Sequence, residues 1–170
     1  SNLGVNSTVE LAGAAGNNGT LTANLKTDTT ADTMTLKLNK DYIDDNNATI
    51  GAHAASHTVV AATVETLNVV STGNNVVTTP TTPTTYKADV LKNTLTLTGS
   101  NELTSLVVSG DKELSFTSTA AMTKLATIDA SAKPKDFLFC VPAKIISSDL
   151  APLKDFILCS PKTHLILSDI

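Results

Sequence analysis

Three consecutive lines of eleven residues, TGSNELTSLVV (98–108), SGDKELSFTST (109–119) and AAMTKLATIDA (120–130), carry the strongest fold signal in this sequence. Leu103, Leu114 and Leu125 occupy the same place in each line, and Gly99 and Gly110 share another. Eleven residues accommodate a short strand and a turn, so the repeat predicts either successive faces of a solenoid coil or successive strands of a meander. The period alone does not choose between them.

Upstream of the repeat, apolar and polar side chains alternate in the same way. Met34, Leu36 and Leu38 alternate with Thr and Lys, and Leu95 and Leu97 lie between threonines. Period-2 alternation is typical of strands with one buried face, and Gly- and Asn-rich turns separate the segments. We therefore predict an all-β fold, either a parallel β-solenoid or stacked short-strand repeats, with an antiparallel β-sandwich as the alternative.

The alternation also predicts which side chains are buried. The expected core residues are Leu36, Leu38, Leu67, Val69, Leu95, Leu97, Leu103, Leu106, Val108, Leu114, Phe116, Leu125 and Ile128. The Ala-rich segment 50–64 is ambiguous, because Ala55, Val59 and Ala62 would share a helix stripe whereas Thr58, Val59 and Val60 favour a strand. For this segment we predict a loop followed by a strand.

Composition divides the chain into four parts. The segment 78–85, TTPTTPTT, predicts a stiff connector, because proline cannot donate ladder hydrogen bonds. It separates a first β-repeat region, 1–77, from a second, 86–132. Residues 133–170 form an atypical tail with one of the 28 Thr, none of the 13 Asn and both cysteines.

The tail has a repeat of its own, in which KDFLFCVP (135–142) matches KDFILCSP (154–161) at a spacing of 19. Two explanations fit. A repetitive gene whose reading frame slips near Lys133 would yield a foreign composition that still repeats, and a genuine second segment with a hydrophobic role would do the same.

The net charge of the chain and the absence of several sequence motifs exclude some classes of function. The chain has 12 Lys, no Arg and 16 acidic residues, a formal charge of −4, so no basic face is expected for a nucleic-acid partner. No stretch approaches the length of apolar residues that a membrane helix needs. A Gly-x-Ser-x-Gly elbow, a phosphate-binding loop and a Trp platform for sugars are all missing from the sequence. We expect a protein that is not an enzyme.

Several sequence segments, taken together, resemble a known protein family. They are DTMTLKLN (32–39), VETLNV (64–69), LVVSGDKELSF (106–116) and LATIDASA (125–132), which cover most of the body and none of the tail. In this order they resemble the repetitive strands of Gram-negative surface-layer (S-layer) proteins. The resemblance implies a secreted structural protein, exported by a type I route, that self-associates into a two-dimensional lattice on the bacterial cell surface.

The resemblance also implies partners. Calcium often strengthens such lattices, and attachment to an outer-membrane glycolipid would use regions that the sequence does not identify. The family's calcium-binding nonapeptide, Gly-Gly-x-Gly-x-Asp, is absent here. The alternative function is an adhesin or glycan-binding module on the same kind of scaffold, which would stay monomeric and bind a host or glycan ligand.

The candidate metal ligands are few. Asp41, Asp44, Asp45 and Asn47 form an oxygen-rich cluster suited to calcium, although the EF-hand spacing is missing. His53 and His57 have the i, i+4 spacing of a zinc pair on a helix, but two exposed histidines on a loop are the favoured interpretation.

The two cysteines belong to the tail. The 19-residue spacing of Cys140 and Cys159 would allow a bridge if the tail folds. The body therefore has to fold without disulfides.

Overall fold

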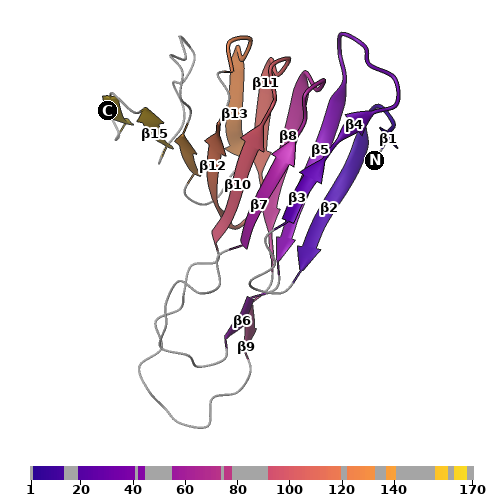
Figure 1. Cartoon of the computed structure of the whole chain (residues 1–170). Helices are drawn as coiled ribbons and strands as arrows, with labels where there is room; N and C mark the ends of the chain where they lie inside the picture. Colours follow the sequence, from indigo (N-terminus) through magenta and orange to yellow (C-terminus); the bar gives the residue numbers. More distant parts are fainter. Residues whose placement is uncertain are drawn as a thin grey trace, which may run out of the picture.

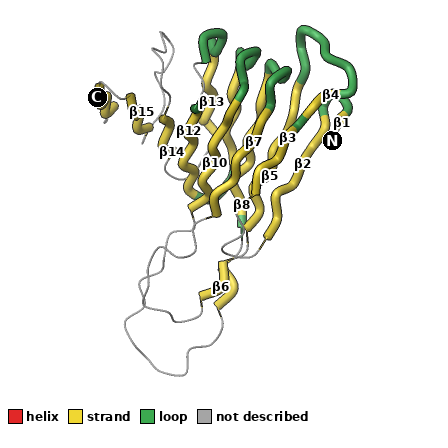
Figure 2. The backbone as a smooth tube through the Cα atoms, in the orientation of Figure 1, coloured by secondary structure: helices red, strands yellow, loops and turns green. Residues whose placement is uncertain are grey.

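The computed structural model describes residues 2–13, 19–40, 42–44, 55–73, 75–77, 92–119, 122–132, 137–140, 156–160 and 163–167. These residues form strands, turns and loops, and they contain no helix (Figure 2). The strands are β1 (Asn2–Leu3), β2 (Ser7–Gly13), β3 (Gly19–Thr22), β4 (Asn24–Leu25), β5 (Thr33–Lys40), β6 (Tyr42–Asp44), β7 (Ala55–Val60), β8 (Thr66–Thr72), β9 (Asn75–Val77), β10 (Lys92–Thr98), β11 (Ser105–Ser109), β12 (Glu113–Ser118), β13 (Thr127–Ala132), β14 (Phe137–Cys140), β15 (Phe156–Ser160) and β16 (Thr163–Leu167).

Two large sheets hold most of these strands (Figure 1). The seven-stranded sheet has the order β16-β15-β14-β12-β10-β7-β3, and the five-stranded sheet has the order β13-β11-β8-β5-β2. From β7 to β14, apart from β9, which pairs with β6 in a small sheet of its own, successive strands along the chain fall in alternate large sheets. Neighbours within each large sheet are parallel over this stretch. The chain therefore winds as a stack of coils with one strand of each coil on each face, which is the predicted parallel β-solenoid.

The register explains the eleven-residue repeat. Leu106 of β11 lies opposite Ile128 of β13, its partner 22 residues later, so one coil spans two of the eleven-residue lines. Each line is a half-coil made of one strand and one corner. The antiparallel β-sandwich does not form, because β11 pairs with β8 and β13 in parallel and not with β12, its neighbour in the chain.

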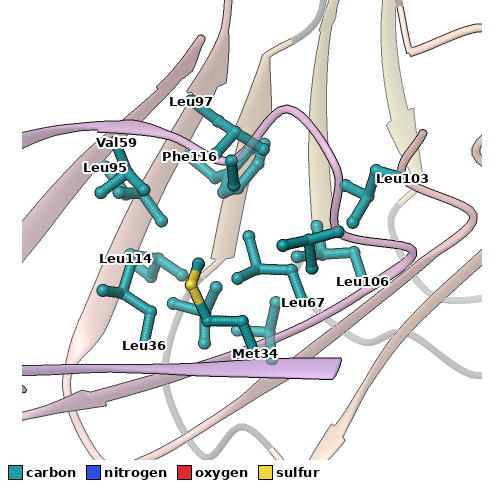
Figure 3. Packing of buried hydrophobic residues seen from close by; sticks show 14 of the residues in the cluster. Met34, Leu36, Val59, Leu67, Leu95, Leu97, Leu103, Leu106, Leu114 and Phe116 are labelled. Atoms are coloured by element: carbon teal, nitrogen blue, oxygen red, sulfur yellow. The ribbon is translucent and has the colours of Figure 1, made fainter. Parts of the chain in front are cut away.

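A single apolar core fills the space between the two sheets (Figure 3). Met34, Leu36, Leu67 and Leu106 point from the five-stranded sheet toward Leu95 and its neighbours on the seven-stranded sheet. Every expected core residue is buried except Ile128, which is half-buried and packs against the cluster. Ile128 is less covered because β13 is the edge strand of its sheet.

Threonine occupies many of the outward positions of the same strands, such as Thr66 and Thr72 on β8. The burial of β8 alternates strictly, with Leu67, Val69 and Ser71 buried and the residues between them half-buried. Thr is β-branched and suits a pleated strand, and its hydroxyl tolerates water. The Ala-rich segment 50–64 contains a strand, β7, from Ala55 to Val60, and residues 61–64 form a turn after it. Its residues 50–54 lie outside the described part of the chain.

Strands from both β-repeat regions and from the tail share the seven-stranded sheet. β14 pairs in parallel with β12, and β15 pairs in parallel with β14. The 19-residue repeat of the tail becomes the register of this last pair, because Phe137 lies opposite Phe156. Phe139 is fully buried and stacks on Phe116, with ring centroids 5.1 Å apart. The sheet ends with β16, which runs antiparallel to β15.

Candidate functional site

The outer side of the seven-stranded sheet presents an array of hydroxyl groups. Its central row consists of Thr20, Thr58, Thr96 and Thr117, which are partners in register on four adjacent strands. We define the hydroxyl face as Thr20, Thr22, Ser56, Thr58, Thr94, Thr96, Thr98 and Thr117. Its members are half-buried within the sheet or, at the edge strand β3, exposed. Alternation creates this face, since each hydroxyl lies between inward-facing residues such as Leu95 and Leu97.

The outer side of the five-stranded sheet differs because it carries charges. Lys37 lies 3.4 Å from Glu10, and the Asn39 amide donates a 2.6 Å hydrogen bond to the same carboxylate. The hydrogen bond from Asn39 and the charge of Lys37 lower the pKa of Glu10. At the opposite edge, hydrogen bonds from the Ser131 hydroxyl and backbone N–H lower the pKa of Asp129. The two sheets therefore offer chemically different surfaces.

A backbone ladder closes the corner that precedes the five-stranded sheet. The carbonyl of Asp32 accepts hydrogen bonds from the N–H groups of Glu65 and Thr66, and the carbonyl of Glu65 accepts from Thr104 and Ser105 in the next coil. We call this the corner ladder, formed by Asp32, Glu65, Thr104 and Ala126. It repeats once more between the Thr104 carbonyl and the N–H groups of residues 126 and 127.

Two carboxylates strengthen the corner ladder. Buried Asp32 accepts hydrogen bonds from the Thr29 N–H at 2.6 Å and the Thr29 hydroxyl at 2.7 Å. The Asp32 N–H in turn donates to Glu65 Oε2 at 2.8 Å. These acidic side chains satisfy backbone and hydroxyl donors of the turn, so the geometry assigns them a structural role.

The opposite corner contains a buried polar cluster that the sequence reasoning missed. Asn93 is fully buried, and its amide donates to Ser71 Oγ at 2.9 Å and to the Thr72 carbonyl at 3.1 Å. The Ser71 hydroxyl donates to the Glu113 carbonyl at 3.2 Å. A signal for it was present, because Asn93 stands two residues before Leu95 and hence at an inward position of the alternating strand.

The predicted calcium cluster lies at the margin of the described chain. Asp44 is the last residue of β6, which pairs with β9, and both strands extend beyond the coils (Figure 1). Asp41, Asp45 and Asn47 lie outside the described residues. Within the described ranges, no three His, Cys, Asp or Glu side chains come together as a metal site.

The interpretation of His57 as an exposed loop residue is wrong. His57 lies on β7, opposite Leu95 in the register, and its side chain is only 9% exposed. The strand places it on the inner side because it alternates with Thr58, so the helical i, i+4 relation to His53 does not arise. His53 lies outside the described residues.

The register places the two cysteines on neighbouring strands. Cys140 of β14 lies directly opposite Cys159 of β15, in the row that continues from Thr117. The 19-residue spacing noted in the sequence thus corresponds to neighbouring positions on adjacent strands of the sheet. A disulfide bridge between the two cysteines stays a prediction.

Comparison of this chain with protein-family models, with curated proteins and with solved structures gives no match. In the part of the chain that the structure describes, no helix is long and apolar enough to cross a membrane.

Proposed function

We propose that this chain is a structural part of a secreted bacterial surface-layer protein that self-associates into a lattice on the cell exterior. The observation that carries the proposal is the row of four threonines on adjacent strands of the seven-stranded sheet. Stacked coils repeat the same surface at each strand, about 4.8 Å apart, and such a periodic surface suits contacts between many identical subunits. The proposed role is mechanical, and no catalytic step is assigned.

Calcium is the cofactor proposed for this assembly. Asp41, Asp44, Asp45 and Asn47 would supply carboxylate and amide oxygens, which are the ligands that calcium prefers. Binding there would also reduce the net charge of −4, which opposes contact between copies. A glycolipid of the outer membrane would anchor the lattice.

Electron microscopy of the full-length protein, with and without calcium, tests the proposal. The proposal predicts ordered two-dimensional sheets that lose order when a chelator removes calcium. A protein that stays monomeric in both conditions and binds a glycan would support the adhesin alternative and contradict the lattice. Calorimetric titration of the chain with calcium checks the cofactor separately, because no heat at millimolar calcium would contradict the ion site alone.

A further inference from the structure

We infer that the hydroxyl face is the surface through which one copy of this chain contacts a second copy. The inference rests on the proposed function, and it names which of the two sheet surfaces carries the contact. The occupant is a second hydroxyl face, related to the first by a two-fold axis.

Charge is the first argument. Each copy carries a formal charge of −4, so two copies repel each other unless their contact excludes acidic side chains. The outer side of the five-stranded sheet presents Glu10 near one edge and Asp129 at the other. The hydroxyl face contains no acidic side chain, and half-buried Val60 lies between Thr22 and Thr98 on the same surface. Glu113 lies at the border of the face, on the first residue of β12 and opposite Lys92.

Geometry is the second argument. The central row repeats with the spacing of parallel strands, about 4.8 Å, and Thr94, Thr96 and Thr98 repeat along one strand about 6.6 Å apart. Two such arrays have equal spacings, so rows of one copy can register against rows of the other. A hydroxyl both donates and accepts, which lets identical side chains pair across a two-fold axis. The Thr98 hydroxyl donates to the Val59 carbonyl at 3.3 Å, so it would act as an acceptor in such a contact. The stiff χ1 of Thr lowers the entropy lost on contact.

The area of the hydroxyl face sets the expected strength of the contact between two copies. Four short strands at these spacings cover on the order of 400 Å² per copy, about half of the area that a stable dimer buries on each partner. A single contact is therefore weak, and a lattice gains strength by making several contacts at once. We expect association that depends steeply on protein concentration.

A pair of lysine substitutions on opposite sheets tests the inference. Thr96→Lys places a long charged side chain in the middle of the hydroxyl face, between Thr58 and Thr117. Thr35→Lys makes the same change on the outer side of the five-stranded sheet, between Thr8 of the edge strand β2 and Asn68 of β8. Both variants lower the net negative charge by the same amount, so an effect of net charge alone would change the assembly of both variants equally.

Sedimentation and electron microscopy of the full chain with calcium give the readout. We expect Thr96→Lys to raise the concentration for assembly at least about tenfold, the effect of roughly 1.4 kcal/mol per contact, while Thr35→Lys assembles like the unmodified chain. Assembly of Thr96→Lys at the unmodified concentration overturns the assigned face and leaves the lattice proposal standing. An unmodified chain that never assembles overturns both.

Cross-linking covers the case in which Thr96→Lys does not fold. In a chain with Cys140→Ser and Cys159→Ser, the variant Thr96→Cys should form covalent dimers with a short bismaleimide, and Thr35→Cys should not. Equal dimer yields from the two variants contradict the inference.

Discussion

At the scale of single residues, backbone geometry at the corners of the coils most strongly limits which residues a position accepts. Gly110 has φ of +108°, a left-handed conformation that side chains disfavour, and a Cβ there would lie 2.1 Å from the Ser71 carbonyl oxygen. The Lys112 N–H donates to the same carbonyl at 3.1 Å, so the turn is held directly against the coil below. The sequence predicts a turn at Gly110, but only the stacked neighbour explains why a larger residue does not fit there.

We expect Gly110→Ala to lower the free energy of unfolding by about 3 kcal/mol or more, because the clash is with backbone atoms that cannot rotate away. Gly4→Ala is the matched control, since its Cβ would lie 3.7 Å from Ser7 Oγ in ordinary contact, without a left-handed φ. Its cost should stay within about 0.5 kcal/mol. Urea unfolding measures both, and equal stability of the two variants contradicts the stacked corner.

At the scale of elements, alternation predicted the strands and the core well. Leu36, Leu67 and Leu106 were expected inside from their neighbours alone, and each is fully buried. His57 and Asn93 are polar, yet both occupy inward positions of alternating strands and are buried. A polar side chain is accommodated at an inward position of an alternating strand when a corner or a neighbouring strand supplies hydrogen-bond partners, as Ser71 does for Asn93.

Leu103 tests the packing of a corner. Its side chain is 1% exposed, directly before Thr104 of the corner ladder. Leu103→Asp buries an unpaired charge, which costs on the order of 3–5 kcal/mol, so we expect the second β-repeat region to unfold. Leu103→Met keeps the volume and should lose less than about 1.5 kcal/mol. Circular dichroism during thermal unfolding compares them, and an unchanged melting temperature for Leu103→Asp rules out this register.

Phe139 tests whether the tail packs as an element of the fold. Phe139→Ala removes the ring that stacks on Phe116 and should lower the free energy of unfolding by about 3–5 kcal/mol. Leu138→Ala, on the half-buried outer side of the same strand, should cost much less. If both variants unfold at the same denaturant concentration as the unmodified chain, β14 does not pack on β12.

At the scale of the whole molecule, local patterns left the choice between solenoid and meander open. A strand of five residues and a turn look the same in both, because the alternation encodes which side of a strand is buried and not which strand lies beside it. The strand register decides between them, because Leu106 lies opposite Ile128, 22 residues later, in a parallel pair. Glu102 and Lys124, also 22 residues apart, form an ion pair between successive coils.

The pairing of strands is the claim on which the remaining proposals depend, and nuclear Overhauser contacts between backbone protons measure it directly. We predict contacts from Leu95 to both His57 and Phe116, and from Leu106 to both Leu67 and Ile128. A meander would instead show cross-strand contacts between β11 and β12 around the turn at Gly110, for example from Val108 to Leu114. Finding those contacts in place of the first set would contradict the stacked-coil structure.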